Sequence, residues 1–316
     1  MPDSNMIATI TLNPAIDKSV TVRGFEIGKT NRGEVDRVDA GGKGINVARA
    51  LKRLGSSVCA LGLVAGSNGR FILDALSAEG IPADFVQVPG ETRVNLKIHD
   101  PEKGTETELN EPGFHVTPEH LEELRGKIAD HAPHCEVMVF SGSLPPDAPP
   151  EIFADMIRIA KAHGAKCFLD TAGPALKLGL AAWPYLIKPN RAEVEDLLNT
   201  TLPTRRELVE AARELMRMGS EQVLISLGAE GAVGVAGKEA LFARPPTVKV
   251  RSSIGAGDTM VAVMAHAAVE GIPFRQAFRM AVAASAATVA KEGTKVADLA
   301  AVRALLPEVR LEDVVG

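Results

Sequence analysis

The sequence predicts an α/β fold with a mostly parallel sheet and a second, smaller sheet that we call the lid. Two observations predict this fold. From about residue 44 onward, short apolar stretches typical of strands alternate with amphipathic stretches typical of helices, a spacing that produces parallel sheets. Other strands alternate polar and apolar residues, as expected of a sheet with one exposed face. No linker rich in Pro, Gly or Ser divides the 316 residues, so we expect one domain over 1–316.

The first element expected is a buried strand over residues 6–12, which are apolar and β-branched and run into a turn at Asn13 and Pro14. The lid is then expected from two segments far apart in the chain, about 14–40 and 90–111. A polar turn, PEKG, separates its last two strands as in a hairpin. The expected lid strands are 18–24, 33–40, 93–100 and 105–110.

The remaining segments are expected to form the core. Helices are expected over 45–54, 69–79, 257–270 and 274–291, and strands over 57–64, 83–88, 135–140, 165–170, 185–190 and 221–228. Polar residues end four of these strands. Because ligands of open α/β sheets bind outside the carboxyl ends of strands, we expect these residues to line one crevice. They are Ser141, Asp170, Asn190 and Ser226.

The composition excludes several classes of protein. With 46% hydrophobic and 24% charged residues, the chain is typical of a globular protein. No apolar run reaches the roughly 18 residues of a membrane span, and the first residues lack a signal-peptide pattern, so we expect a cytoplasmic protein without a membrane partner. A net charge of −5 with no basic cluster argues against a nucleic-acid partner. Cys59, Cys135 and Cys167 lack metal-ligand spacing and are expected to be core thiols.

The segment from Ser252 to Thr259, SSIGAGDT, precedes a long apolar helix. Its small residues would expose consecutive backbone N–H groups at a helix amino end, an arrangement suited to phosphate. Asp258 would lie at the edge of this anion hole, where it could take a proton from an attacking hydroxyl. Asp is also a common N-cap residue, so the segment alone leaves both interpretations open.

A second Gly-rich segment, AGGKGIN from Ala40 to Asn46, also leads into a helix. Its glycines allow close approach to a ligand, and Lys43 and Asn46 offer a cation and an amide. A tight turn with a solvated lysine explains the segment equally well. Residues 24–30 end like a P-loop, but the first glycine stands one place too late. No complete GxGxxG follows a strand, so neither a P-loop enzyme nor a Rossmann dehydrogenase is predicted.

Three weaker patterns are compatible with ligand binding. Asn190 and Glu193 would share the first turn of a helix, where they could bind hydrated Mg²⁺ or simply form a capping box. The segment 226–232 reads as a Gly-rich turn between two strands. Arg93 could bind a sugar phosphate, and Asp17 could bind sugar hydroxyls, although solvated arginines and turn-forming aspartates are common.

Taken in order, TLNPAID, GGKGINVA, TRVNL, SGSLP, KPN with its NxxE, SLGAEGA and GAGDT resemble the PfkB (ribokinase-like) carbohydrate kinases along the whole chain. Within the family, the segments GGKG, TRVNLKI and SGSLPPD are most similar to 1-phosphofructokinases, with tagatose-6-phosphate kinases and minor 6-phosphofructokinases as close neighbours. The resemblance implies a ribokinase-like, doubly wound, mostly parallel sheet flanked by helices, with a small discontinuous β lid. It implies ATP-dependent phosphorylation of a sugar phosphate, first of all fructose 1-phosphate, with Mg²⁺ and a homodimer formed through the lid.

The resemblance also implies roles for individual residues. Asp258 would be the general base, and the amides of Gly255, Ala256 and Gly257 would stabilise the transferring phosphoryl group. The residues implied for the sugar phosphate are Asp17, Gly41, Gly42, Lys43, Asn46, Arg93 and Ser141. Those implied for ATP are Lys188, Asn190, Ser226, Gly228, Ala229, Glu230 and Gly231, with Glu193 on Mg²⁺ through water. Lys29 is given no role, and Arg32 is a further candidate.

A function of another class stays open, that of a sugar-phosphate-binding regulator with the same fold but without turnover. The intact Asp258 and the complete Gly255–Ala256–Gly257 segment favour the kinase, because a regulator would have no use for a general base beside a phosphate site.

Overall fold

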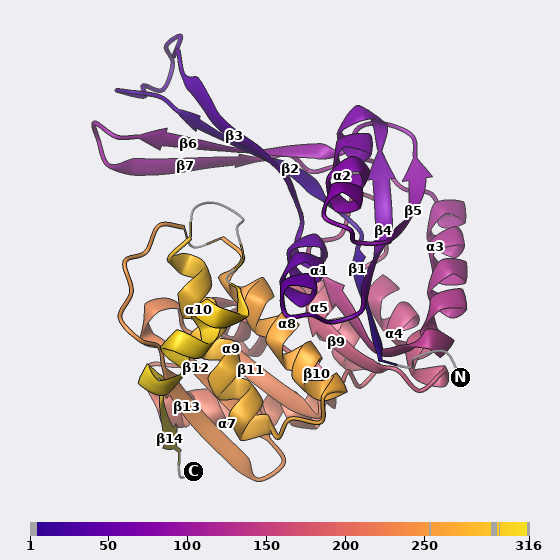
Figure 1. Cartoon of the computed structure of the whole chain (residues 1–316). Coiled ribbons are helices and arrows are strands. Elements are labelled where there is room, and N and C mark those ends of the chain that lie inside the picture. Colours follow the sequence, from indigo (N-terminus) through magenta and orange to yellow (C-terminus); the bar gives the residue numbers. More distant parts are fainter. Residues whose placement is uncertain (1–4, 253, 292–295, 297, 315–316) are drawn as a thin grey trace.

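In the computed structural model, which describes residues 5–252, 254–291, 296 and 298–314, the strands form two sheets (Figure 1). The large sheet has ten strands in the order β14-β13-β12-β11-β10-β9-β8-β1-β4-β5. Its strands are β1 Met6–Thr11, β4 Val58–Ala65, β5 Ala83–Val88, β8 Cys135–Ser141, β9 Lys166–Asp170, β10 Leu186–Ile187, β11 Gln222–Ser226, β12 Ala232–Ala236, β13 Glu239–Arg244 and β14 Arg310–Asp313.

The chain winds outward from β1 in both directions. It passes first to β4 and β5 on one side of β1, then returns to β8 and continues through β9, β10 and β11 on the other side, and these strands are all parallel. The edge beyond β11 is antiparallel. The direction of winding therefore reverses at β1, and such a switch point is where doubly wound folds bind their ligands. The predicted α/β fold with a mostly parallel sheet is confirmed.

Helices cover both faces of the large sheet, as expected when every parallel connection carries a helix. The buried side chains of α3 to α7 form one core layer, and those of α1, α2 and α8 to α10 form the other. The helices are α1 Lys43–Arg53, α2 Gly66–Ala78, α3 Pro118–His131, α4 Ile152–Ala162, α5 Gly173–Leu180, α6 Arg191–Leu198, α7 Arg205–Gly219, α8 Ala256–Val269, α9 Phe274–Val289 and α10 Leu299–Leu305.

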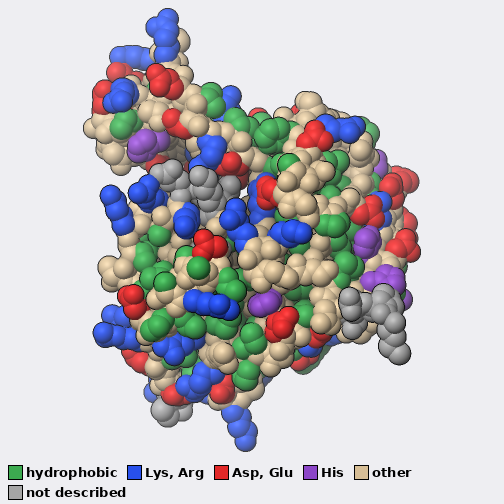
Figure 2. Space-filling model, viewed as in Figure 1, with side chains coloured by type: hydrophobic (Ala, Val, Ile, Leu, Met, Phe, Trp, Pro, Cys, Tyr) green, Lys and Arg blue, Asp and Glu red, His purple; other side chains and the backbone are tan. Residues whose placement is uncertain are grey.

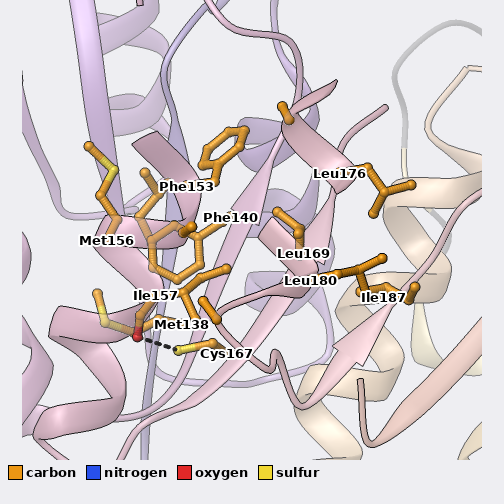
Figure 3. Packing of buried hydrophobic residues seen from close by; sticks show 14 of the residues in the cluster. Met138, Phe140, Phe153, Met156, Ile157, Cys167, Leu169, Leu176, Leu180 and Ile187 are labelled. Carbon is orange, nitrogen blue, oxygen red and sulfur yellow. Dashed lines mark hydrogen bonds between the residues drawn. The ribbon is translucent and has the colours of Figure 1, made fainter. Parts of the chain in front are cut away.

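The core layer under α4 and α5 shows how these elements are held (Figure 3). Phe140 of β8 packs edge to face against Phe153 of α4, with ring centroids 6.3 Å apart. The Cys167 thiol, on β9, donates to the carbonyl oxygen of Ile157. Both aromatic side chains are completely buried, so this layer fixes β8 and β9 beneath α4, and with them the strand ends at the crevice.

The lid is the smaller sheet, with four strands in the order β3-β2-β6-β7. It extends away from the core on one side of the molecule (Figure 1). β2 pairs antiparallel with β3 and parallel with β6, which forms a hairpin with β7. The two pairs come from the two segments expected to build the lid. Its strands are β2 Ala15–Thr21, β3 Glu34–Gly41, β6 Arg93–Asp100 and β7 Thr105–Asn110.

Several elements differ from the sequence prediction, among them β13 and α10, which were not predicted. β10 has two residues, Leu186 and Ile187, whereas a strand over 185–190 was expected, because Pro189 lacks the N–H that a sheet ladder needs. The antiparallel edge strand β14 was not predicted at all, since its sequence RLED is mostly polar. In the described part of the chain, no helix is both long and apolar enough to cross a membrane.

Candidate active site

The carboxyl ends of the central strands lie beside the amino ends of α1 and α8. Ser141 ends β8, Asp170 ends β9, and Asn190 forms an isolated bridge with Ser226, the last residue of β11. The N–H of Gly142 donates to the carbonyl oxygen of Asp170 over 2.9 Å, which joins two of these strand ends. The four polar strand ends therefore follow one another along the edge of the sheet where ligands of this fold class bind.

The amino end of α8 brings backbone N–H groups and a lysine to this edge. Gly255 is the N-cap, with a φ of 76° that glycine adopts without strain. A methyl group on Gly257 would lie 3.0 Å from Lys188 Nζ, so the ammonium group lies directly against the first turn of the helix. The helix dipole and this buried cation both favour an anion at the same point. Ser253, from the same sequence motif, lies outside the described residues.

Asp258 lies in the first turn of α8 and is 7% exposed. Its Oδ2 accepts a hydrogen bond from Asn46 Nδ2 over 2.8 Å, which joins α8 to α1. Burial, followed by the negative charge of Asp170, raises the pKa of Asp258 to about 6. Lys43, Asn46 and Lys188 act in the opposite direction. A carboxylate with a pKa near neutrality is well matched to accepting a proton from a substrate.

Asp170 lies at the centre of this cluster, although the sequence assigned it no role beyond that of a strand end. Its Oδ1 lies 3.1 Å from Lys43 Nζ and 3.5 Å from Lys188 Nζ. Burial acts to raise the pKa of Asp170, but Lys188 and Lys43 outweigh it and hold the pKa below its usual value. In turn, the carboxylate of Asp170 is the main cause of the raised pKa of Lys43. The sequence feature that marks Asp170 is a charged residue at the end of an apolar strand.

The lid contributes two charged side chains at its junction with the core. Asp17 Oδ1 accepts a hydrogen bond from Asn95 Nδ2 over 3.1 Å, and burial raises the pKa of Asp17. Arg93 Nη2 donates to the carbonyl oxygen of Asn13 over 3.2 Å and to Ser143 Oγ over 3.3 Å. The Nε of Arg93 is buried without a partner in the described part of the chain, so this N–H is available to a ligand.

The Gly-rich segment between the lid and α1 fits closely against its neighbours. Gly42 is the N-cap of α1, with a φ of 126°, and a methyl group there would lie 3.0 Å from Thr11 Cγ2. A methyl group on Gly41 would meet the carboxylate of Asp17, so the backbone passes close to that side chain. Gly42 therefore requires glycine because of its positive φ, and Lys43 follows as the first residue of α1.

A cleft of about 910 Å³ lies between the end of β11 and the amino end of α8. This volume is within the range of sites for nucleotide-sized ligands. The wall contains one stacked pair, in which the Arg205 guanidinium lies 3.7 Å from the ring centroid of Phe242. The predicted residues that line the cleft are Ser226, Gly228, Ala229, Glu230, Gly231, Ala256 and Gly257. Residues that the sequence did not indicate include Arg191, Arg205, Phe242, Arg244, Ala286 and Val289.

Asn190 and Glu193 form a complete capping box at the start of α6. The N–H of Glu193 donates to Asn190 Oδ1 over 2.9 Å, and the N–H of Asn190 donates to Glu193 Oε2 over 2.8 Å. The structure therefore contains the capping box that the sequence allowed for these two residues. Within residues 5–252, 254–291, 296 and 298–314, no group of three His, Cys, Asp or Glu side chains is arranged to hold a metal ion.

The model of the pfkB family carbohydrate kinases matches residues 9–300 of the chain. The chain belongs to this family. Among similar proteins, the 1-phosphofructokinase of Rhodobacter capsulatus is 40% identical over 288 residues, covering 91% of both chains. That of Bacillus subtilis is 33% identical over 306 residues, covering 97% of this chain and 99% of the other. The structure of phosphofructokinase-2 from Escherichia coli in complex with potassium is 30% identical, with a TM-score of 0.90, and the match covers 96% of this chain and 98% of that one.

Charge is distributed unevenly over this pfkB-family kinase. Lys and Arg side chains gather on the face just below the lid (Figure 2). Lys29 and Arg32, the two residues without a firm expectation, are exposed in the loop between β2 and β3, where Lys29 pairs with Glu26 over 2.6 Å. The ion pair with Glu26 explains the position of the Lys29 side chain without a contact to a substrate.

Proposed function

We propose that this kinase transfers the γ-phosphoryl group of ATP to the free primary hydroxyl of fructose 1-phosphate, giving fructose 1,6-bisphosphate and ADP. ATP-dependent phosphorylation of a sugar phosphate agrees with the nearly full-length similarity to 1-phosphofructokinases. The observation that carries the proposal is the position of Asp258, a buried carboxylate with a raised pKa at the anion-binding end of α8. Fructose 6-phosphate is the second candidate acceptor, because phosphofructokinase-2 from Escherichia coli, of similar structure, has been solved in complex with fructose-6-phosphate.

In this proposal, Asp258 accepts the proton of the attacking hydroxyl. The hydroxyl oxygen forms a bond to the γ-phosphorus while the bond from that phosphorus to the ADP oxygen breaks. The backbone N–H groups of Gly255, Ala256 and Gly257 stabilise the negative charge on the transferring group, and Lys188 lies close enough to add its charge. Asn46 holds the carboxylate of Asp258 in place through its hydrogen bond.

The sugar phosphate would bind between the lid and the strand ends. Lys43 and Arg93 supply positive charge for its phosphate, and Asp17 accepts hydrogen bonds from its hydroxyls. Gly41 and Gly42 allow close approach of the backbone. Three buried polar atoms at this edge have no partner in the described part of the chain and are therefore available to the substrate. They are Ser141 Oγ, Asn46 Oδ1 and Asp170 Oδ2.

ATP would occupy the 910 Å³ cleft, with its phosphates directed toward Gly257 and Lys188. Mg²⁺ bound with the nucleotide would neutralise part of the phosphate charge. Since Mg²⁺ keeps several waters and usually binds through one or two carboxylates plus phosphate oxygens, a single nearby carboxylate suffices. The carboxylate of Glu193 can supply this oxygen ligand. It lies close enough to Lys43 for its negative charge to raise the pKa of that lysine.

Glu193→Gln is expected to raise the Mg²⁺ concentration needed for half-maximal rate. Gln can keep the capping hydrogen bond to Asn190, so the change removes the charge and spares the cap. The rate would be measured against Mg²⁺ at saturating ATP and sugar phosphate, with thermal unfolding as the control for stability. An unchanged Mg²⁺ requirement would show that Glu193 is a capping residue and nothing more.

Arg93→Ala is expected to lower kcat/KM for fructose 1-phosphate by about 10- to 100-fold, because charge-assisted hydrogen bonds contribute roughly 1.5–3 kcal/mol. Arg93 is the lid residue proposed to bind the phosphate, so activity on unphosphorylated fructose should hardly change. The test of the proposed function is therefore a panel assayed by ADP release with ATP and Mg²⁺. It contains fructose 1-phosphate, fructose 6-phosphate, tagatose 6-phosphate and free fructose, each with wild type and Arg93→Ala.

Each result of the panel has a distinct meaning. Background ADP release with every acceptor would exclude the kinase. Preference for fructose 6-phosphate or tagatose 6-phosphate would retain the mechanism and change the substrate. An equal loss on all acceptors in Arg93→Ala would mean that Arg93 supports the lid instead of binding phosphate.

We further propose that this is a cytoplasmic enzyme and that it forms a homodimer through the lid. One row of paired residues crosses the four strands of the lid and consists of Val38, Lys18, Leu96 and Leu109. Val38 and Leu109 are 42% and 59% exposed, and burial of exposed apolar residues favours association.

Leu109→Asp is accordingly expected to convert the dimer to a monomer, because it places a charge in the proposed interface. Molar mass from light scattering after gel filtration would measure this. Phe71→Asp on α2 is the matched control, since Phe71 is a 43% exposed apolar residue outside the lid. If wild type and both variants have the mass of a monomer, the lid is not a dimer interface.

A further inference from the structure

A cluster of two thiols, an imidazole and a carboxylate lies at the end of the sheet opposite the active site. Cys135 is the first residue of β8, and Cys59 is the second residue of β4. His131, the last residue of α3, places its Nδ1 3.9 Å from Cys59 Sγ. The other ring nitrogen, Nε2, lies 2.9 Å from Asp84 Oδ2. Along β8, six residue steps of about 3.3 Å separate Cys135 from Ser141 at the active site, a distance of about 20 Å.

The geometry is that of a thiol, a base and an orienting acid in series. Asp84 fixes the ring of His131, and Lys127 pairs with the other oxygen of the same carboxylate. The carboxylate of Asp84 accepts a hydrogen bond from the Nε2–H of this ring, which leaves Nδ1 as the atom that can accept the proton of the Cys59 thiol. Transfer of that proton to Nδ1 gives the thiolate.

The second thiol adds to this effect. The neighbouring thiol of Cys135 is the largest cause that lowers the pKa of Cys59; the charge of His131 adds to it, and burial opposes both. The same interaction raises the pKa of Cys135, which therefore stays protonated. Cys167 provides a contrast within the same chain, because its thiol is buried with only carbonyl oxygens as partners and its pKa is raised to about 12.

We propose that Cys59 is a modification site, a thiol that gives its proton to His131 and that peroxides then oxidise to a sulfenic acid. The sulfur lone pair attacks one oxygen of the peroxide, so that an S–O bond forms as the O–O bond breaks. Sulfur is oxidised and the peroxide is reduced. The departing hydroxide, or alkoxide for an organic peroxide, takes the proton from His131 Nδ1 and leaves as water or alcohol.

The surroundings of Cys59 define which reactant fits. Cys59 is 4% exposed, whereas the side chains of His131 and Asp84 are 26% and 42% exposed. The groups that move the proton thus reach solvent, whereas Cys59 is almost completely buried, so the reactant that we propose is a small one such as hydrogen peroxide.

The sulfenic acid is also the expected end product. β4 and β8 lie on opposite sides of β1, so two inter-strand spacings, about 9.6 Å, separate them. A disulfide accepts a Cα separation of at most about 6.8 Å, so Cys135 cannot reach Cys59 to form one without movement of the backbone.

The test exposes the native enzyme to hydrogen peroxide for set times and then removes the oxidant with catalase. The protein is unfolded in excess dimedone, which traps sulfenic acid, and the remaining thiols are alkylated. Mass spectrometry of the peptides then gives the rate for each cysteine. We expect Cys59 to be oxidised at least about 10-fold faster than Cys167, which serves as the internal reference.

Two variants distinguish an effect of the His131 cluster on the oxidation rate of Cys59 from an effect of solvent exposure alone. His131→Gln removes the imidazole that takes the Cys59 proton, and we expect the oxidation of Cys59 to slow by about 10-fold. His134→Gln is the matched control, because His134 is exposed in the turn that follows α3, and it should leave the rate unchanged. Asp84→Asn should also slow the oxidation of Cys59, and it replaces His131→Gln as the test variant if His131→Gln does not fold. The kinase rate of each unoxidised variant shows that it is folded, since the cluster is remote from the active site.

The proposal is overturned if Cys59 is oxidised no faster than Cys167 in the wild type. It is equally overturned if Cys59 keeps its full rate in folded His131→Gln or, where that variant does not fold, in Asp84→Asn. If the protein has no kinase activity on any acceptor, thermal unfolding replaces activity as the control for folding, and the rates of cysteine oxidation can still be compared. The proposed thiol site and the proposed kinase function can therefore fail independently.

Discussion

Asp258→Asn is expected to lower kcat by about 10²–10⁴-fold, the usual value of general-base catalysis, and to leave the affinity for ATP nearly unchanged. Asparagine matches the size of the carboxylate, so Asn46 keeps a hydrogen-bond partner, but it cannot accept the proton of the hydroxyl. Because the group acts mainly in the transition state, KM should change far less than kcat. Steady-state kinetics and ATP titration measure both effects.

Asp130→Asn, at an exposed position on α3, is the matched control for the chemical change and should retain full activity. Thermal unfolding of Asp258→Asn should show a stable fold, since burial disfavours the charge that the substitution removes. A fully active Asp258→Asn enzyme would rule out this residue as the base and return the question to the other carboxylate of the cluster, Asp170.

Asp170→Asn is expected to destabilise the protein by about 3–5 kcal/mol, the cost of leaving one partner of a buried ion pair without the other. Lys188 is 5% exposed and would lose its anionic partner, whereas Lys43 is partly solvated and contributes less. Urea unfolding measures this change. A loss of less than 1 kcal/mol would mean that the two lysines find other partners in the folded enzyme.

The same variant has a pH signature. Wild type should lose kcat/KM as the pH falls through about 6, because Asp258 is then protonated and cannot act as a base. The charge of Asp170 is one cause of that raised pKa, so its removal should shift the acid limb of the profile to lower pH. If folded Asp170→Asn enzyme shows an unchanged pH profile of kcat/KM, the loss of activity at low pH is not caused by protonation of Asp258.

Much of the fold and part of the site follow from the sequence because strand ends are marked by composition. Ser141, Asp170 and Ser226 each stand where an apolar run stops, and parallel strands carry their carboxyl ends to one edge. The lid strands were predicted from their period of two, since a sheet with one solvated face leaves this pattern. These features are local in sequence, and each needs only a few residues to be recognised.

The parts that could not be predicted depend on contacts between distant segments. Lys188 was expected at ATP through its place in the KPN motif, but only the folded chain shows its ammonium between Asp170 and Gly257. The stacking of Arg205 on Phe242 likewise joins α7 to β13 across the cleft. Arg205 and Phe242 stand in no pattern that periodicity or turn chemistry can mark, so no feature of the sequence alone would have selected these two residues.

Two of the four connections that join the lid to the core are short, and they carry Asn13 and Gly42. Three residues link β1 to β2, and Gly42 alone links β3 to α1. A strand of seven residues spans about 23 Å, so a turn of about 10° at these connections moves its outer end by about 4 Å. Such a rotation of the lid, about points beside the proposed sugar-phosphate site, would therefore move a surface far larger than the ligand that binds there.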